Sequence, residues 1–397
     1  MSSASDPLGG AARVFALAAA LLVGINLRPA ITSVAALLDQ ATETFALDGV
    51  QRSLLATLPV IAFGLTAPLG PLLARRFGTA RALVIAMAAL AASLVLRVLD
   101  GWLLLPGTFL SGAAIMVGAT LLPPYLKSLN AGGLWVGLSS MSFGVGAALG
   151  AGLAVPLDVT LGGVAPALAA WALLAALAGL TMALVSGRGA VSAAASRPPL
   201  ALAAEVRPTV ILMTAVFSLQ ALLYFAVTTW LPLMLASHGE DRATAGWLLG
   251  WFSLIGLIPS LLAPVIARRR RLLVWFGPGL GLVMAAGFVW FALDAGSDAA
   301  VVTVLGVVQN AGFGLAMGLL VSLSADESSA GILSAIAQGI GYAVAGGASL
   351  LLGIAHDLTG EWTVSLVVMA LLAVMLSAAV ALAIRRRPVS LVAAPVR

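Results

Sequence analysis

Long apolar runs, separated by short polar links, repeat along the whole chain. Most runs hold about 20 residues, the length of helix that crosses the hydrocarbon core of a bilayer. They do not show the shorter alternation of apolar and polar residues that marks the strands of a membrane β-barrel. The pattern therefore predicts twelve spanning helices, at residues 14–38, 53–74, 82–99, 103–126, 135–156, 164–186, 209–236, 244–267, 272–293, 299–323, 331–355 and 362–384.

The predicted helices fall into two halves that repeat each other. Leu138–Gly146 in the fifth helix matches Leu333–Gly341 in the eleventh, and Pro71–Arg76 matches Pro264–Arg269. Two six-helix halves in the same orientation resemble the plan of a major facilitator transporter, in which substrate binds at mid-membrane between the halves. We expect an all-α membrane protein of two pseudo-symmetric six-helix bundles. Its predicted parts are an N-terminal bundle (1–186), a cytoplasmic linker (187–208) and a C-terminal bundle (209–397).

Composition and charge exclude several other classes of protein. Of the 397 residues, 61% are hydrophobic and only 9% are charged, too few for the surface of a soluble globule. The chain has no cysteine, which excludes disulfides and thiolate chemistry. A net charge of +5 is compatible with nucleic-acid binding, but most Arg and Lys residues lie at helix ends on one side. We interpret them as topology signals, and expect both termini on the cytoplasmic side of the inner membrane and no nucleic-acid partner.

Five short blocks resemble the cyanate and 2-nitroimidazole transporter family (CynX/NimT-like) of the major facilitator superfamily. They are Asn26–Ala30, Leu223–Tyr224 with Thr229–Pro232, Gly312–Ala316, Ala337–Tyr342 and His356–Gly360. The resemblance covers nearly the whole chain and implies a secondary transporter of small polar or anionic organic solutes.

The loop after the second helix departs from the superfamily pattern, which usually has an Asp-Arg pair there. This chain has Ala74 before Arg75 and Arg76. We keep the two arginines as candidate conformational residues, either as orientation charges or as partners of a neighbouring helix end.

Arg28 lies about halfway along the first predicted helix. An arginine at that depth costs about 2.5–3.5 kcal/mol on insertion scales. All 15 acidic residues fall in tails, links or helix ends, so no buried carboxylate is predicted to neutralise it or to carry protons. An anionic or strongly dipolar solute would supply the missing partner, because guanidinium presents a planar fork of donors. The alternative is that backbone carbonyls hold Arg28 and it merely locks two helices together.

Neutral polar residues recur at helical spacing on other predicted helices, which line the central cavity in this superfamily. With Arg28, the candidates for substrate binding are Asn26, Thr32, Gln220, Tyr224, Thr228, Trp230, Gln309, Asn310, Gln338 and Tyr342. The alternative is that Ser, Thr, Asn and Gln hydrogen-bond membrane helices to one another, and that Trp230 is an interfacial anchor. At the outer helix ends we expect His238 and His356 in solvated structural roles and Arg97 snorkelling to the surface.

Proline and glycine are the candidate moving parts. Pro29 permits a kink in the first helix, while Gly144, Gly146, Gly339 and Gly341 let helices approach closely and slide. Simple tight packing is the alternative for each glycine.

We therefore predict a monomeric alternating-access carrier of a cyanate-like or nitroimidazole-like solute, held by Arg28 with hydrogen bonds from Tyr224, Gln309 and Gln338. No phosphate-binding loop, metal cluster or nucleophile–base pair is seen in the sequence, so we expect no enzyme activity, cofactor or metal. Two alternatives remain. One is a proton-linked exporter of neutral drug-like compounds that uses an acid near a helix end, such as Asp39 or Asp326, and the other is a membrane receptor that transports nothing.

Overall fold

Helices make up nearly all of the chain that the computed structural model describes, residues 10–186 and 204–391. Most of the predicted linker, residues 187–203, lies outside the described residues, as do the two chain ends. Within the described ranges, eleven helical segments are long and apolar enough to cross a membrane, and the bent pair α4–α5 makes a twelfth. The predicted all-α membrane fold is confirmed.

Residues 10–186 form the six spans of the first half, and three of these spans are broken. The elements are α1 (Gly10–Asn26), α2 (Pro29–Ala36), α3 (Leu38–Thr44), α4 (Gly49–Thr66), α5 (Leu69–Phe77), α6 (Thr79–Leu96), the 3-10 turn η1 (Gly101–Leu103), α7 (Leu104–Ser128), α8 (Gly133–Gly152), α9 (Ala154–Leu161) and α10 (Val164–Ser186). Pro29 begins α2, and Pro68 precedes α5 at a bend of 52°. Because proline cannot donate a backbone hydrogen bond, both breaks follow from the sequence.

The second half repeats this plan with fewer breaks. Its helices are α11 (Arg207–Ser237), α12 (Arg242–Ile255), α13 (Leu257–Ala267), α14 (Arg270–Ala292), α15 (Asp298–Ser322), α16 (Glu327–Thr359) and α17 (Thr363–Ala383). The eighth span is divided into α12 and α13 at Gly256, whereas α16 runs for 33 residues and exceeds the predicted span at both ends.

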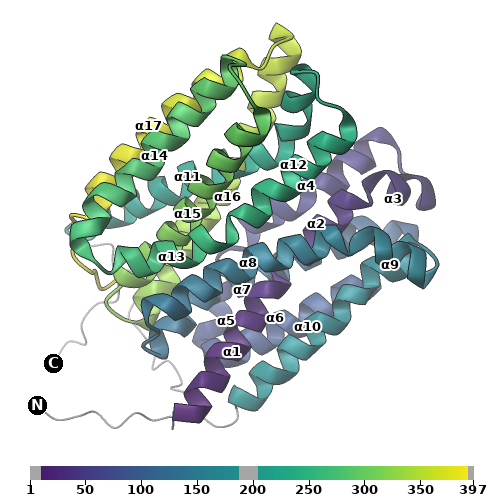
Figure 1. The fold of residues 1–397 in the computed structure, drawn as a ribbon. Helices are drawn as coiled ribbons and strands as arrows, with labels where there is room; N and C mark the ends of the chain where they lie inside the picture. The colour runs from purple at the N-terminus through teal and green to yellow at the C-terminus, as the bar shows by residue number, and fades with distance from the viewer. Residues whose placement is uncertain (1–9, 187–203, 392–397) are drawn as a thin grey trace, which may run out of the picture.

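The helices of each half pack mainly against one another, and a few helices join the halves. In Figure 1 the first half, mostly purple to blue, occupies the lower part of the view, and the second half, teal to yellow, the upper part. Within the halves, α6 packs on α7 and α10, α11 on α16, and α14 on α17. Between the halves, α8 packs on α13, and α16 packs on both α4 and α7.

The four predicted glycines divide into two pairs with different surroundings. Gly144 and Gly339 lie at equivalent positions of the repeat and face the other half: a Cβ there would come within 2.6 Å of Leu257 and 2.5 Å of Ala67, respectively. Gly146 and Gly341 instead pack inside their own halves, against α1 and α11. The first pair therefore permits close approach of the halves, whereas the second pair serves packing within each half.

One end of the bundle carries most of the basic residues that the structure describes, and we call it the basic end. It is formed by the ends of α5, α7, α13 and α17 and the starts of α6, α11 and α14, with Arg75, Arg76, Arg81, Lys127, Arg207, Arg268, Arg269, Arg270, Arg271, Arg385, Arg386 and Arg387. The two halves touch there through a hydrogen bond from Thr79 to Glu327 and another from Lys127 Nζ to the carbonyl of Val321 (3.3 Å). Arg75 and Arg76 are exposed at the end of α5, and Arg76 stands over the ring of Phe77 at 5.3 Å.

The predicted snorkelling of Arg97 is wrong. Its side chain is fully buried at the end of α6, 0% exposed, and donates to backbone carbonyls. The apolar run offered no sign that the neighbouring helices α2 and α10 would cover this position.

A disulfide between α4 and α16 should join the two halves. A Cβ at Gly64 would lie 3.2 Å from the Cβ of Ala343, close to the separation of about 3.5–4.5 Å found in disulfides. The chain has no other cysteine. We expect Gly64→Cys with Ala343→Cys to cross-link on mild oxidation, so that protein cut at a protease site inserted in residues 187–203 still migrates as one band without reductant.

Each single cysteine variant is the control and should separate into two bands after cutting. Separation of the double variant under oxidising conditions would contradict this contact between α4 and α16.

Candidate functional site

The first span breaks at Leu27 and Arg28, between α1 and α2. Arg28 has φ −126° and ψ −37°, outside regular helix geometry. Pro29 cannot donate a hydrogen bond to the carbonyl of Ile25, and that oxygen points at α8, where a Cβ on Gly146 would overlap it. The break thus follows from Pro29 and is accommodated by a glycine on the neighbouring helix.

The guanidinium of Arg28 reaches from the first half to aromatic rings of the second. Its Cζ lies 5.5 Å from the ring centroid of Tyr224 and 5.6 Å from that of Phe225, both on α11. The residues that the structure describes offer it no hydrogen bond or ion pair. Arg28 is half-buried, so its charge is held mainly by cation–π attraction.

A small cavity beside Arg28 lies between the two halves. Its volume is about 10 Å³, roughly the space of one water molecule. It is lined by Leu27, Arg28, Phe63, Ile115, Met116, Ala119, Phe143 and Tyr342. An organic solute can enter only if the halves separate.

Aromatic rings from both halves surround this cavity. Tyr342 contacts Phe63 (5.1 Å between ring centroids), Phe217 (5.4 Å) and Phe225 (5.9 Å), and Phe143 meets Phe313 at 5.4 Å. The phenylalanines were not among the predicted site residues, because they carry no polar signal in an apolar helix. A signal existed for Phe143, since it occupies the position of Gln338 in the repeated segment.

Three predicted residues meet at this site, and a fourth borders it. Arg28, Tyr224 and Tyr342 lie together around the cavity and the rings. Gln338 is buried on α16 and donates from Nε2 to Ser334 and to the carbonyl of Ala119 (3.2 Å), a cavity-lining residue of α7. Gln338 therefore joins the halves next to the cavity.

Three other predicted amides hold helices of the second half together. Gln220 donates to the carbonyl of Gln309 (2.7 Å), and Gln309 donates to that of Leu223 (3.3 Å), so the pair links α11 and α15. Asn310 binds the carbonyl of Phe252 in α12 (3.3 Å). These contacts match the alternative of helix-joining hydrogen bonds.

The remaining candidates lie elsewhere. Asn26 binds α10, while the hydroxyls of Thr32 and Thr228 bond to carbonyls of their own helices at 3.2 and 3.0 Å. Trp230 packs on Trp362, with ring centroids 5.5 Å apart. The Thr32 hydroxyl thus reaches the backbone carbonyl of Arg28, but none of these bonds involves the Arg28 guanidinium.

Both histidines are packed rather than solvated. His356 stacks on Trp362 at 4.0 Å. His238 is 13% exposed and bonds to Asp298 (3.0 Å), with Asp294 at 3.4 Å. In the described chain, this His-Asp-Asp group brings three potential metal ligands within 4.8 Å of one another.

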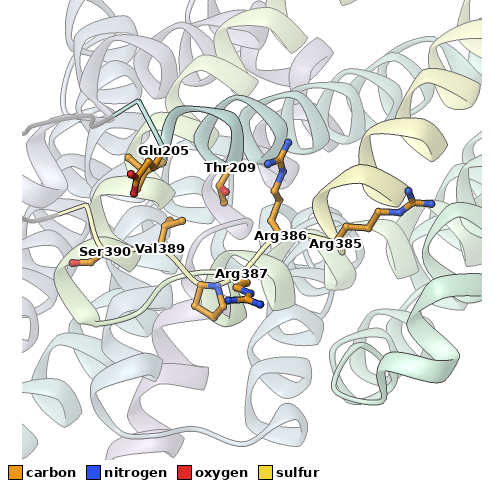
Figure 2. Close-up of a pocket in the computed structure, with 9 residues that line it drawn as sticks. Glu205, Thr209, Arg385, Arg386, Arg387, Val389 and Ser390 are labelled. Atoms are coloured by element: carbon orange, nitrogen blue, oxygen red, sulfur yellow. The ribbon is translucent and has the colours of Figure 1, made fainter.

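A larger cavity, of about 440 Å³, opens at the basic end. It is lined by Glu205, Val206, Thr209, Arg385, Arg386, Arg387, Pro388, Val389 and Ser390. Figure 2 shows the three arginine side chains pointing in different directions, so they form no common anion-binding point.

Comparison with known proteins settles the class of this molecule. The model of the Major Facilitator Superfamily matches residues 14–349. The chain belongs to this superfamily. It is 30% identical to the 2-nitroimidazole transporter of Escherichia coli (strain K12) over 378 residues, 94% of this chain and 96% of the relative. It is 28% identical to the cyanate transport protein CynX of the same strain over 352 residues, covering 86% and 90%.

The superfamily also accounts for the fold. The solved structure of the superfamily transporter FucP in the outward conformation aligns with a TM-score of 0.69 at 15% identity, covering 92% of this chain and 98% of FucP. These matches confirm the predicted family resemblance and the fold of two pseudo-symmetric bundles. They also confirm that this superfamily member is a membrane transporter of small solutes rather than an enzyme.

Replacing Gly146 should destabilise the superfamily fold at the Arg28 break. The new methyl group of Gly146→Ala would overlap the carbonyl of Ile25, which is backbone and cannot move aside. We expect a loss of about 1–3 kcal/mol, seen as a lower midpoint of thermal unfolding in detergent. Gly152→Ala is the matched control on α8, because nothing lies within 4 Å of a Cβ there. An equal midpoint for both variants would contradict the close contact.

Proposed function

We propose that this transporter moves a small planar organic anion, or a strongly dipolar solute of cyanate-like or nitroimidazole-like kind, and that Arg28 holds its negative end. The observation that carries the proposal is the Arg28 guanidinium, which lies beside a central cavity with aromatic rings but no described oxygen partner. The relatives named for 2-nitroimidazole and cyanate transport agree with such a solute.

The energetics favour an anion over the rings as the partner of Arg28. Cation–π attraction contributes about 0.5–2 kcal/mol. Hydrogen bonds to a charged group contribute about 1.5–3 kcal/mol each, and a carboxylate-like or nitro-like group can accept two from one guanidinium. Among the described carboxylates, those of Asp298 and Glu327 lie in the first turns of α15 and α16 and so cannot compete at mid-span.

The rings around the cavity favour a flat solute. Phe63, Phe143 and Tyr342 line it with apolar faces, and Gln338 beside it supplies an amide. A planar heterocycle would pack against such faces while its polar edge met Arg28. The whole site belongs to one chain, which supports a monomeric carrier.

We further propose alternating access of two rigid bundles, residues 1–186 and 209–397, joined by the 187–208 linker. The cavity holds only about 10 Å³ in this conformation, and the missing side chains at Gly144 and Gly339 let the halves come close enough to slide past one another. The concentration of arginines at the basic end supports placing that end, and both termini, on the cytoplasmic side of an inner membrane.

The proton-linked alternative gains no support from its proposed acids. Asp326 caps α16, where its carboxylate accepts from the backbone N–H and the hydroxyl of Ser329. The side chain of Asp39 lies outside the described residues.

Removing the guanidinium should abolish binding. We expect Arg28→Gln to lose transport of 2-nitroimidazole and cyanate in proteoliposomes, and Arg28→Lys to retain about a tenth or less, because ammonium lacks the planar fork. The thermal shift that either compound gives the purified protein should disappear in parallel. Arg386→Gln, an exposed charge change, is the control. Full transport by a folded Arg28→Gln protein would contradict the proposal.

Orientation can be tested with single cysteines, since the chain has none of its own. Ser128→Cys lies at the end of α7 near the basic end, and Thr160→Cys lies in α9 at the opposite end; both positions are exposed. In intact cells, a membrane-impermeant maleimide should label position 160 and not 128. The reverse result would place the basic end outside.

A further inference from the structure

A second arginine lies among the spanning helices of the first half. Arg97 is 0% exposed, and no carboxylate among the described residues pairs with it. It donates from one terminal nitrogen to the carbonyl of Ala30 (3.2 Å) and from the other to that of Leu168 (3.2 Å). Its Nε has no hydrogen-bond partner in the described part of the chain. A buried charge held only by carbonyls is costly, which calls for a reason beyond packing.

The two carbonyls that Arg97 joins lie on different helices. Ala30 is in the first turn of α2, two residues beyond Arg28, and Leu168 is on α10. One guanidinium therefore fastens the far side of the break in the first span to α10.

Asn26 fastens the near side of the same break to the same helix. It is the last residue of α1, 4% exposed, and its Nδ2 donates to the carbonyls of Leu22 (2.8 Å) and Leu174 (3.2 Å). Leu168 and Leu174 are six residues apart on α10, about 9 Å along its axis. Arg28 thus lies between two attachments to one rigid helix.

The break needs such support because its own backbone bonds are few. On one side of it, Leu27 N–H bonds to the carbonyl of Gly24 (3.2 Å), a bond of the shorter three-residue type. On the other side, Ile31 N–H and Thr32 N–H both bond to the carbonyl of Arg28 (3.0 and 3.1 Å), so none of these bonds joins α1 to α2. Arg97 itself is held from behind by α7, where a Cβ on Gly107 would overlap its Cβ. The position of Arg28 is therefore set by side chains of neighbouring helices rather than by helix regularity.

We propose that Arg97 and Asn26 form a clamp that positions Arg28 for the solute. They are positioning residues that touch no solute themselves, and their role rests on the proposed function of Arg28. Losing either attachment lets the break move, so that the guanidinium no longer stays at the cavity. A displacement of about 1 Å at such a contact can cost orders of magnitude in activity.

The first test reads the break itself and needs no solute. The variant Arg28→Cys has a single thiol, and the small volume of the cavity, about 10 Å³, should keep its reaction with maleimide slow. We expect Arg97→Lys or Asn26→Leu, added to Arg28→Cys, to speed labelling about five-fold or more, because the segment opens more often.

Ser93→Ala is the matched control for a lost buried hydrogen bond on α6. Its hydroxyl bonds to the carbonyl of Leu90 in its own helix (2.9 Å) and to the hydroxyl of Ser111 on α7 (2.9 Å), so neither of these hydrogen bonds reaches α2 or α10. It should lower the thermal midpoint in the way the clamp variants do, yet leave the labelling rate unchanged. Equal labelling rates in all three backgrounds would overturn the clamp.

The second test reads function with Arg28 intact. In proteoliposomes, Arg97→Lys and Asn26→Leu should raise the KM for 2-nitroimidazole about ten-fold, while Ser93→Ala leaves it unchanged. If Arg97→Lys does not fold, the test rests on Asn26→Leu alone, and an unchanged KM for 2-nitroimidazole in that variant overturns the clamp. Loss of function in Arg28→Gln together with normal KM in both clamp variants would reject the clamp and keep the proposed function. Normal transport by Arg28→Gln would reject the proposed function. The labelling rates would still test whether Arg97 and Asn26 hold the break in place, because that measurement uses no solute.

Discussion

The stacking of the Arg28 guanidinium on the rings of Tyr224 and Phe225 is the contact on which the central arrangement depends. It takes a charge from the first half and offsets it with rings of the second half, and no described carboxylate pairs with that charge. The buried charge of Arg97 is stabilised differently, by hydrogen bonds to backbone carbonyls of its own half. Arg97 is therefore held within one bundle, whereas Arg28 contacts the opposite half, a contact that the proposed alternating access would break.

The geometry of that contact begins with a single proline. Pro29 interrupts the helix and leaves the carbonyl of Ile25 without an intrahelical donor. Because Gly146 has no side chain, it leaves the space that this oxygen occupies. Interrupted spanning helices are tolerated where neighbouring groups re-satisfy or cover the freed backbone. Here the neighbours are α8 on the side of Gly146 and α10 through Asn26 and Arg97. The break at Arg28, the contact with Gly146 and the proposed clamp of Arg97 and Asn26 therefore depend on one another.

Sequence reasoning could find the spans, the repeat, Arg28 and its two tyrosines, because length, periodicity and an expensive charge are visible in one dimension. It could not tell a cavity-facing amide from one that joins helices. Gln220 has the helical spacing of Tyr224 and Thr228, and Gln309 lies on another predicted cavity helix, yet each binds the backbone across α11 and α15. Periodicity fixes the face of a helix but not the neighbour that covers it. For the same reason Arg97 looked like a surface residue, and the phenylalanines around Tyr342 gave no signal at all.

The exchange of partners at Arg28 also suggests how solute could be coupled to movement without a buried acid. A ligand shifts a conformational equilibrium only by its difference in affinity for the two states. An anion that takes the guanidinium away from α11 replaces a contact between the halves with a contact to itself, and its charge-assisted hydrogen bonds exceed the cation–π attraction that is lost. The contacts between the halves that remain include the hydrogen bond of Gln338, the packing of α8 on α13 and the contacts at the basic end. Under the proposed function, binding would therefore weaken the central junction directly, and the energy for this step would come from the charge of the solute.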